Sequence, residues 1–100
     1  MTEWIYFIHP PRADFAETMT GIEKEVWSRH FVRLQELGAE GRLILAGPTL
    51  GEVNTGIVVF EAPNRAAAEE IMRGDPTIKE GFASGDLRPF RASLLRGRNC

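Results

Sequence analysis

One histidine, His30, has a side chain and a setting suited to acid-base chemistry. It lies in the stretch EVWSRHFVRL, residues 25–34, among apolar side chains that include Trp27 and Phe31. A histidine exchanges protons near neutral pH, and a positioned general acid or base typically contributes about 10²–10⁴ to a rate. The alternative is a core histidine hydrogen-bonded to a backbone carbonyl, because buried polar groups normally have partners. The residues alone leave both interpretations open.

A capping box predicts where the helix that carries His30 begins. The Thr20 hydroxyl can accept from the backbone N–H of Glu23, and the Glu23 carboxylate can accept from the N–H of Thr20. Apolar residues then recur every three or four positions, which predicts an α-helix of about 20 residues that ends near Gly38 or Gly41. The predicted buried stripe consists of Ile22, Val26, Trp27, His30, Phe31, Leu34 and Leu37.

Four short segments have the composition of β-strands. The first stops at Pro10, and the turn TLGEVN at residues 49–54 predicts that the second and third strands are antiparallel neighbours. Pro89 indicates an edge position or a bulge for the fourth. We expect these strands at residues 3–9, 42–48, 55–62 and 85–95, a second helix capped by Asn64 at 65–73, a short helix or turn within 75–82, and a loop or irregular turn at 12–19.

The order of these elements, βαββαβ, predicts an α+β fold of the ferredoxin-like type. Two helices then cover one face of a four-stranded antiparallel sheet. The first strand has apolar side chains on both of its faces, with Trp4, Tyr6 and Ile8 on one side and Ile5 and Phe7 on the other. An antiparallel sheet with one face in water would instead alternate with polar residues. We therefore expect a homodimer through the open sheet face, which forms a dimeric α+β barrel.

Composition excludes several classes of protein. One hundred residues with 43% hydrophobic side chains predict a single domain over residues 1–100, with a flexible tail at 96–100. A net charge of −2 argues against nucleic acid as a partner. Cys100 is the only cysteine, so no internal disulfide is expected, and a reducing cytoplasmic location fits. No segment has the pattern of a secretion signal or a membrane span.

Four segments together resemble the YCII-related, or YciI-like, family. They are HPPRADFAETMT, the helix with a central histidine, GRLILAGPTL and GDPTIKEGF, and they follow one another in order over most of the chain. The resemblance implies a ferredoxin-like fold that dimerises as an α+β barrel. It also implies an active site that pairs the helix histidine with the aspartate of the DP step, here His30 and Asp75. Known reactions among such barrels include chloride removal from a chlorinated hydroxyquinol and lactone isomerisation, so the resemblance suggests small ring-like substrates.

Asp75 has a purely structural interpretation as well. It follows Gly74 and precedes Pro76, which is typical of an N-cap with proline at the first helical position. The two roles are compatible because a carboxylate has two oxygens. One can accept from the backbone while the other orients the His30 ring and stabilises the imidazolium.

Six further residues are candidates for contacts with a ligand. The segment AGPT, residues 46–49, ends a predicted strand at the rim of the implied pocket, where glycine permits close backbone approach and threonine offers a hydroxyl. Aromatic residues, including Tyr6 and Phe31, are expected to line an apolar cavity or simply the core. The ligand-binding candidates are Gly47, Pro48, Thr49, Phe82, Trp27 and Arg12, the last as a partner for an anionic group.

Three functions compete at this point. The first is a small cofactor-independent enzyme, of isomerase, lyase or dehydrochlorinase type, in which His30 and Asp75 act as an acid-base pair on a small cyclic or aromatic oxygenated substrate. The second is a non-catalytic module that binds a small ligand or regulates as a dimer. The third is a haem protein with a histidine ligand, for which nothing besides His30 argues. No metal site is expected, because His9, His30 and Asp75 lack any recognisable metal-ligand spacing.

Overall fold

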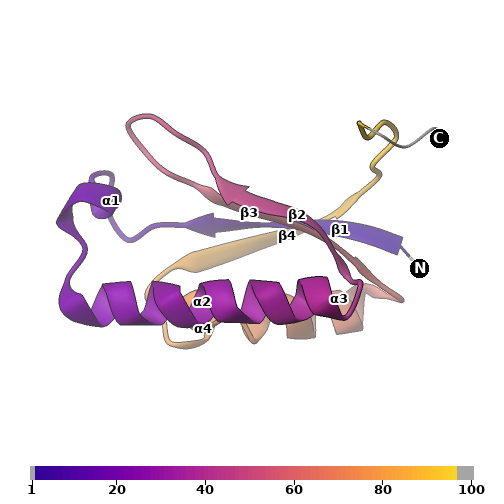
Figure 1. Cartoon of the computed structure of the whole chain (residues 1–100), viewed down its shortest axis with the longest axis horizontal. Coiled ribbons are helices and arrows are strands. Elements are labelled where there is room, and N and C mark those ends of the chain that lie inside the picture. Colours follow the sequence, from indigo (N-terminus) through magenta and orange to yellow (C-terminus); the bar gives the residue numbers. More distant parts are fainter. Residues whose placement is uncertain (1, 97–100) are drawn as a thin grey trace.

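The computed structural model describes residues 2–96, and these form one antiparallel sheet with its main helices on one face (Figure 1). The strand order is β2-β3-β1-β4, with every neighbouring pair antiparallel. The α+β class and the βαββαβ order are therefore confirmed. The elements are β1 (Thr2–His9), α1 (Phe15–Thr18), α2 (Gly21–Ala39), β2 (Leu43–Pro48), β3 (Gly56–Ala62), α3 (Arg65–Arg73), α4 (Pro76–Lys79) and β4 (Ser84–Phe90).

The long helix α2 begins at the predicted capping box. Thr20 Oγ1 accepts from the N–H of Glu23 at 3.2 Å, and Glu23 Oε1 accepts from the N–H of Thr20 at 2.8 Å. The helix ends at Ala39, and Gly41 supplies the left-handed residue after it, with φ of 76°. Gly38 lies inside the helix.

The buried stripe of α2 is narrower than predicted. Val26, His30, Leu34 and Leu37 are buried as expected, whereas Ile22 is 67% exposed and Phe31 is 56% exposed. At about 100° per residue, these two lie roughly 80° and 100° to either side of His30, so they fall outside the face that packs on the sheet.

Two further helices follow their predicted caps. Asn64 Oδ1 accepts from the N–H of Ala67, and α3 occupies the predicted residues 65–73. Asp75 is the N-cap of the one-turn helix α4, with Pro76 at its first position. The predicted loop at residues 12–19 contains one helical turn, α1, which buries Phe15. Such a turn is too short for an apolar period to reveal it.

Strand β1 lies at the centre of the sheet and carries the core. Trp4, Tyr6 and Ile8 face the helices and are buried, because successive side chains of a strand point to opposite faces. Pro89 lies in the edge strand β4, as predicted. That strand ends at Phe90 rather than continuing to residue 95. Beyond it, the N–H of Ala92 donates to the side-chain carboxylate of Glu3 at 2.9 Å rather than to a backbone carbonyl of a neighbouring strand.

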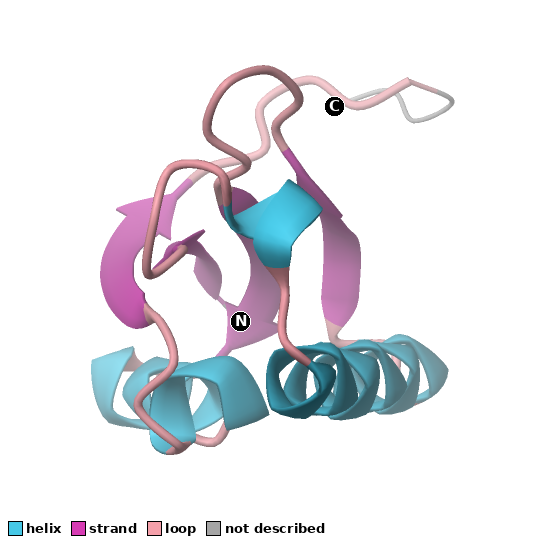
Figure 2. Ribbon diagram, turned by 90° about the vertical axis from the view of Figure 1, so that its left-hand side faces the viewer, coloured by secondary structure: helices cyan, strands magenta, loops and turns pink. Residues whose placement is uncertain are grey.

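The helices α2, α3 and α4 lie on one face of the sheet, and none of them covers the opposite face (Figures 1 and 2). The register places Ile5 beside Val59 and Phe7 beside Ile57 on this face. The homodimer expected to cover it stays a prediction. Of the predicted tail at 96–100, residues 97–100 lie outside the described residues. Among residues 2–96, no helix has both the length and the apolar character that crossing a bilayer requires.

Candidate active site

His30 and Asp75 meet, although 45 residues separate them in the sequence. His30 Nδ1 lies 2.7 Å from Asp75 Oδ2, in a contact between α2 and the cap of α4. The histidine is 6% exposed and the aspartate is fully buried. The pair suggested by the family resemblance is therefore in hydrogen-bond contact, while a catalytic role for it stays a prediction.

Four hydrogen bonds converge on the Asp75 carboxylate. Its Oδ1 accepts from the backbone N–H of Thr77 at 3.0 Å and from the Thr77 hydroxyl at 2.8 Å. Its Oδ2 accepts from the Tyr6 hydroxyl at 2.7 Å and faces His30 Nδ1. Tyr6 and Thr77 are completely buried. One carboxylate oxygen therefore caps α4 and the other contacts the imidazole, since a carboxylate has two acceptor oxygens.

The protonation states of this cluster follow from its burial and hydrogen bonds. Burial acts to raise the pKa of Asp75, but the hydrogen bond and charge of His30 and the bonds from Tyr6 and Thr77 outweigh it, so the pKa lies below its usual value. Burial and the negative charge of Asp75 raise the pKa of Tyr6. Asp75 is therefore an acceptor only, and the hydrogen between it and His30 sits on Nδ1. This leaves Nε2 of a neutral His30 as the basic nitrogen.

An apolar cavity of about 340 Å³ lies beside His30, between α2 and the edge strand β2. Three of the expected ligand contacts line it, namely Trp27, Gly47 and Pro48. His30 and Gln35 contribute polar side chains to its wall, and Trp27 carries an indole N–H donor. Within residues 2–96, no hydrogen bond to His30 Nε2 is formed. The wall consists of Ile8, Trp27, His30, Phe31, Leu34, Gln35, Gly38, Leu43, Ala46, Gly47, Pro48, Gly56 and Ile57.

Two expected ligand contacts, Thr49 and Phe82, lie outside this wall. The Thr49 hydroxyl closes the β2–β3 hairpin, since it accepts from the N–H of Thr55 at 2.9 Å and donates to the Val53 carbonyl at 3.2 Å. Phe82 follows α4, and its backbone N–H donates to the Thr77 carbonyl. Their predicted contacts with a ligand have no support from this geometry.

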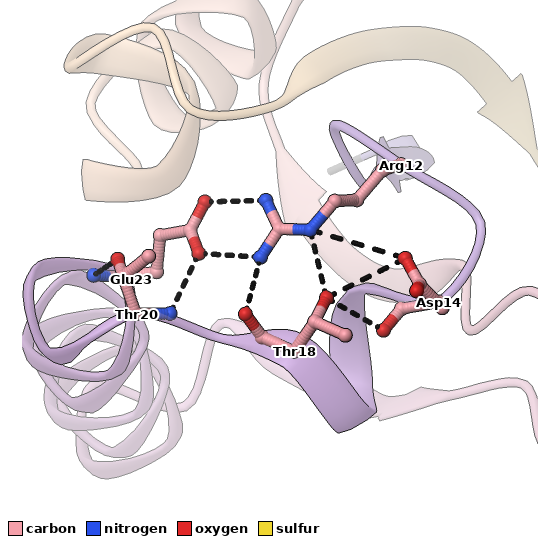
Figure 3. A network of polar contacts seen from close by, with 5 residues as sticks. All are labelled: Arg12, Asp14, Thr18, Thr20 and Glu23. Atoms are coloured by element: carbon pink, nitrogen blue, oxygen red, sulfur yellow. Dashed lines mark hydrogen bonds and ion pairs between the residues drawn. The ribbon is translucent and has the colours of Figure 1, made fainter.

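Arg12 also lies outside the cavity wall, because its guanidinium is engaged within the protein (Figure 3). It donates to both oxygens of Glu23 at 2.9 and 2.7 Å, and to the carbonyl and hydroxyl of Thr18. The hydrogen bond from Arg12 lowers the pKa of Glu23 to about 2. Phe15, which packs against the cavity residue Trp27 with ring centroids 4.5 Å apart, lies on the same segment. The arginine therefore fastens residues 12–18 to α2, and its predicted contact with an anionic ligand stays a prediction.

The sequence interpretation did not identify the two supports of Asp75. Thr77 carries a recognisable signal, since an N-cap carboxylate accepts from the N–H two or three residues ahead. Tyr6 was expected to line the cavity or the core, and nothing in its spacing connects it to a residue 69 positions away. Among residues 2–96, no group of three or more His, Cys, Asp or Glu side chains is placed to hold a metal ion.

Comparison with known proteins agrees with this fold. In solved structures, the chain resembles the 5-chloro-2-hydroxyhydroquinone dehydrochlorinase of Burkholderia phenoliruptrix AC1100 in complex with 2,5-dihydroxybenzoquinone. That match has a TM-score of 0.66 and 16% identity, and it covers 88% of this chain and 93% of the other. No curated protein matches the sequence. The family model of the YCII-related domain matches residues 9–91, and the protein therefore belongs to the YCII-related family.

Proposed function

We propose that the protein is a cofactor-independent acid-base enzyme acting on a small cyclic or aromatic oxygenated substrate. The observation that supports this most is the 2.7 Å contact of His30 Nδ1 with a buried, ionised Asp75 at the edge of an apolar cavity. In this proposal His30 Nε2 takes a proton from a bound substrate. Asp75 holds the ring in the required tautomer and stabilises the imidazolium that forms.

The proposed step is a proton abstraction that can lead either to isomerisation or to loss of chloride. A C–H bond next to a carbonyl or ring oxygen breaks, its proton moves to His30 Nε2, and its electron pair enters the ring system. Returning the proton to another atom gives an isomerase. Loss of chloride with its bonding electrons gives a dehydrochlorinase, the activity named for the similar solved structure. Both outcomes use the same base and need no oxidant.

Hydrogen-deuterium exchange tests this proposal without knowledge of the final product. We would incubate γ-butyrolactone, cyclohexanone and chlorohydroquinone with the protein in D₂O and follow deuterium incorporation and chloride release. Enzyme-dependent exchange that is lost on His30→Gln, with the fold retained by circular dichroism, is the expected result. Exchange that continues at an unchanged rate in the His30→Gln variant would remove His30 from the mechanism.

A second candidate function is a non-catalytic module that binds a small ligand. The apolar wall of the cavity favours it, since binding needs no titrating group. Saturable binding of a small ring compound, with affinity unchanged by His30→Gln and with no exchange or turnover, would support the module over the enzyme.

We also propose that a second copy of the chain covers the open face of the sheet. Ile5, Phe7, Ile57 and Val59 on the two central strands give this face an apolar middle, and Asp86 and Arg88 on β4 give it a polar border. Burying such a face against its own copy satisfies the rule that an apolar sheet face needs cover. Light scattering at micromolar concentration should give twice the mass of the chain, and a monomer mass would contradict the dimer.

A further inference from the structure

We infer that the cavity beside His30 selects uncharged ring compounds and rejects anions of the same shape. This inference deepens the proposed function, because it concerns the ligand class of the same site. It starts from the wall of the cavity, which contains no Arg, Lys, Asp or Glu side chain. Trp27, Phe31 and Leu34 supply apolar surface from α2, and Ala46 and Pro48 supply it from β2.

The two arginines of α2 that neighbour cavity residues in the sequence are committed elsewhere. Arg29, next to His30, is held by Glu25 and Glu80 at distances of 2.8 to 3.0 Å. Arg33 of α2 donates to the carbonyl of Ile71 at the end of α3. With His30 neutral, a carboxylate held against the apolar wall would therefore give up water without gaining a cation. Burying an unpaired charge is among the largest penalties in a protein.

The charge on Asp75 adds to this discrimination. An anion that approached His30 would lie on the far side of the imidazole from a fully buried carboxylate. Like charges at short range in a poorly solvated site repel each other. An uncharged ligand with an acidic C–H or O–H avoids both costs, since it can donate to Nε2 while the rest of its surface contacts apolar side chains.

The cavity has room for a ligand of one or two rings. A cavity of roughly 150 Å³ holds one benzene molecule, and this one measures about 340 Å³. The rings of Trp27 and Phe31 line the wall, and the exposed side chain of Gln35 adds an amide that can donate and accept. Gln35, five residues after His30 on the same helix, would then contact a second polar group on the ligand.

Matched pairs of probes separate charge from shape. We would titrate the purified protein at about pH 8, where an ordinary histidine is neutral, with p-cresol against p-hydroxybenzoate and with benzamide against benzoate. Nuclear magnetic resonance of the Trp27 indole would report occupancy. We expect each neutral probe to bind at least tenfold more tightly than its anion. An anion that binds equally well or better, or the failure of both neutral probes to bind at millimolar concentration, would overturn the inference.

Two variants locate the binding and test the role of charge. Gly38→Met fills the cavity, because a Cβ at this helical position meets only the Leu43 side chain at 3.9 Å, and methionine favours a helix over glycine. It should weaken p-cresol binding at least tenfold, whereas Glu36→Met, an exposed position on the same helix outside the wall, should not. Gln35→Arg should bring p-hydroxybenzoate to at least the affinity of p-cresol. Binding that neither Gly38→Met nor Gln35→Arg alters would refute the assignment.

The inference and the proposed function fail separately. A protein that binds p-cresol in preference to p-hydroxybenzoate, yet exchanges no substrate proton, keeps the ligand class and loses the acid-base activity. A protein that turns over an anionic ring compound through His30 keeps the activity and loses the ligand class.

Discussion

Replacing Asp75 by Asn should reverse the tautomer of His30. The backbone N–H of Thr77 can only donate, and it donates to Asp75 Oδ1 at 3.0 Å. The side-chain oxygen of an asparagine must keep that place, so the amide nitrogen takes the place of Oδ2. This nitrogen donates to His30 Nδ1, which then carries no hydrogen, and the hydrogen moves to Nε2. The nitrogen expected to act as a base becomes a donor.

The opposite orientation of the amide is disfavoured by the buried cap. It would set the amide N–H₂ group of the asparagine against the Thr77 N–H, which would leave a buried donor without an acceptor. The Tyr6 hydroxyl, which donates to Oδ2 in the wild type, can rotate to accept from the amide N–H₂, whereas the backbone N–H of Thr77 cannot turn away from it. The reversed tautomer should therefore be the major one.

The same substitution should destabilise the fold moderately. The two hydrogen bonds from Thr77 to Oδ1, each worth about 1.5–3 kcal/mol while the acceptor is charged, become neutral ones worth about 0.5–1.5 kcal/mol, and the contacts of Tyr6 and His30 at the other atom rearrange. Burial of the carboxylate opposes its ionisation, so removing the charge returns part of this loss. We expect a net cost of about 1–2 kcal/mol and a Tm lower by roughly 5–15 °C for a domain of this size.

The effect on stability also has a definite pH dependence. In the folded protein the hydrogen bonds to Asp75 and the charge of His30 outweigh burial and hold the pKa of Asp75 below its usual value. Its contribution is therefore present above that value and is lost as the pH falls through the folded pKa. The stability difference between the wild type and Asp75→Asn should shrink in acid.

Nitrogen NMR of the imidazole distinguishes the two tautomers directly. Asp86→Asn, which neutralises a carboxylate on the edge strand β4, is the matched control and should leave His30 unchanged. Exchange activity should fall by about 10²–10⁴ with Asp75→Asn, the typical contribution of a general base. A His30 that keeps its hydrogen on Nδ1 in this variant would refute the hydrogen-bond reasoning, whatever the activity.

Three further predictions concern the supports of the site and the open face. Tyr6→Phe removes one hydrogen bond from a buried carboxylate and should cost about 1.5–3 kcal/mol in urea unfolding, and a loss below about 0.5 kcal/mol would contradict this role. Arg12→Met should raise the pKa of Glu23 from about 2 toward 4.5 in a carbon NMR titration, because the hydrogen bond from Arg12 is lost. The stabilisation of the wild-type fold by this ion pair should be present above pH 4.5 and should fade as the pH falls toward 2. An unchanged Glu23 would show that Arg12 is not the cause. Phe7→Asp on the open face should halve the mass measured by light scattering, and an undiminished mass above that of one chain would exclude this face as the contact.

Local signals predicted most of the fold. The capping box at Thr20, the cap at Asn64 and the proline after Asp75 act within a few residues, so helix starts can be read from short patterns. Pro89 similarly indicated an edge strand. Errors arose where the outcome depends on neighbours distant in sequence.

Phe31 is an example of such an error, because it lies about 100° around α2 from His30, and the extent of the sheet beneath the helix decides whether such a flanking residue is buried. The contacts of Arg12 could not be predicted either, since a loop arginine gives no sign that a carboxylate 11 residues later will hold it. The candidate site could be predicted only in part, because the contact between its two residues depends on the fold. His30 was recognisable from its helical stripe, and Asp75 from the family resemblance, but their contact needed the fold.

The position of His30 on α2 explains how one residue can meet both a buried carboxylate and a cavity. Val26, Leu34 and Leu37 define the buried line of the helix, and His30 lies on this line. Trp27 and Phe31 lie on the flank that lines the cavity. A histidine one position later would lie about 100° around the helix, away from Asp75. Only a residue on the buried line and next to the cavity flank can present Nδ1 to the cap of α4 and its other edge to a ligand.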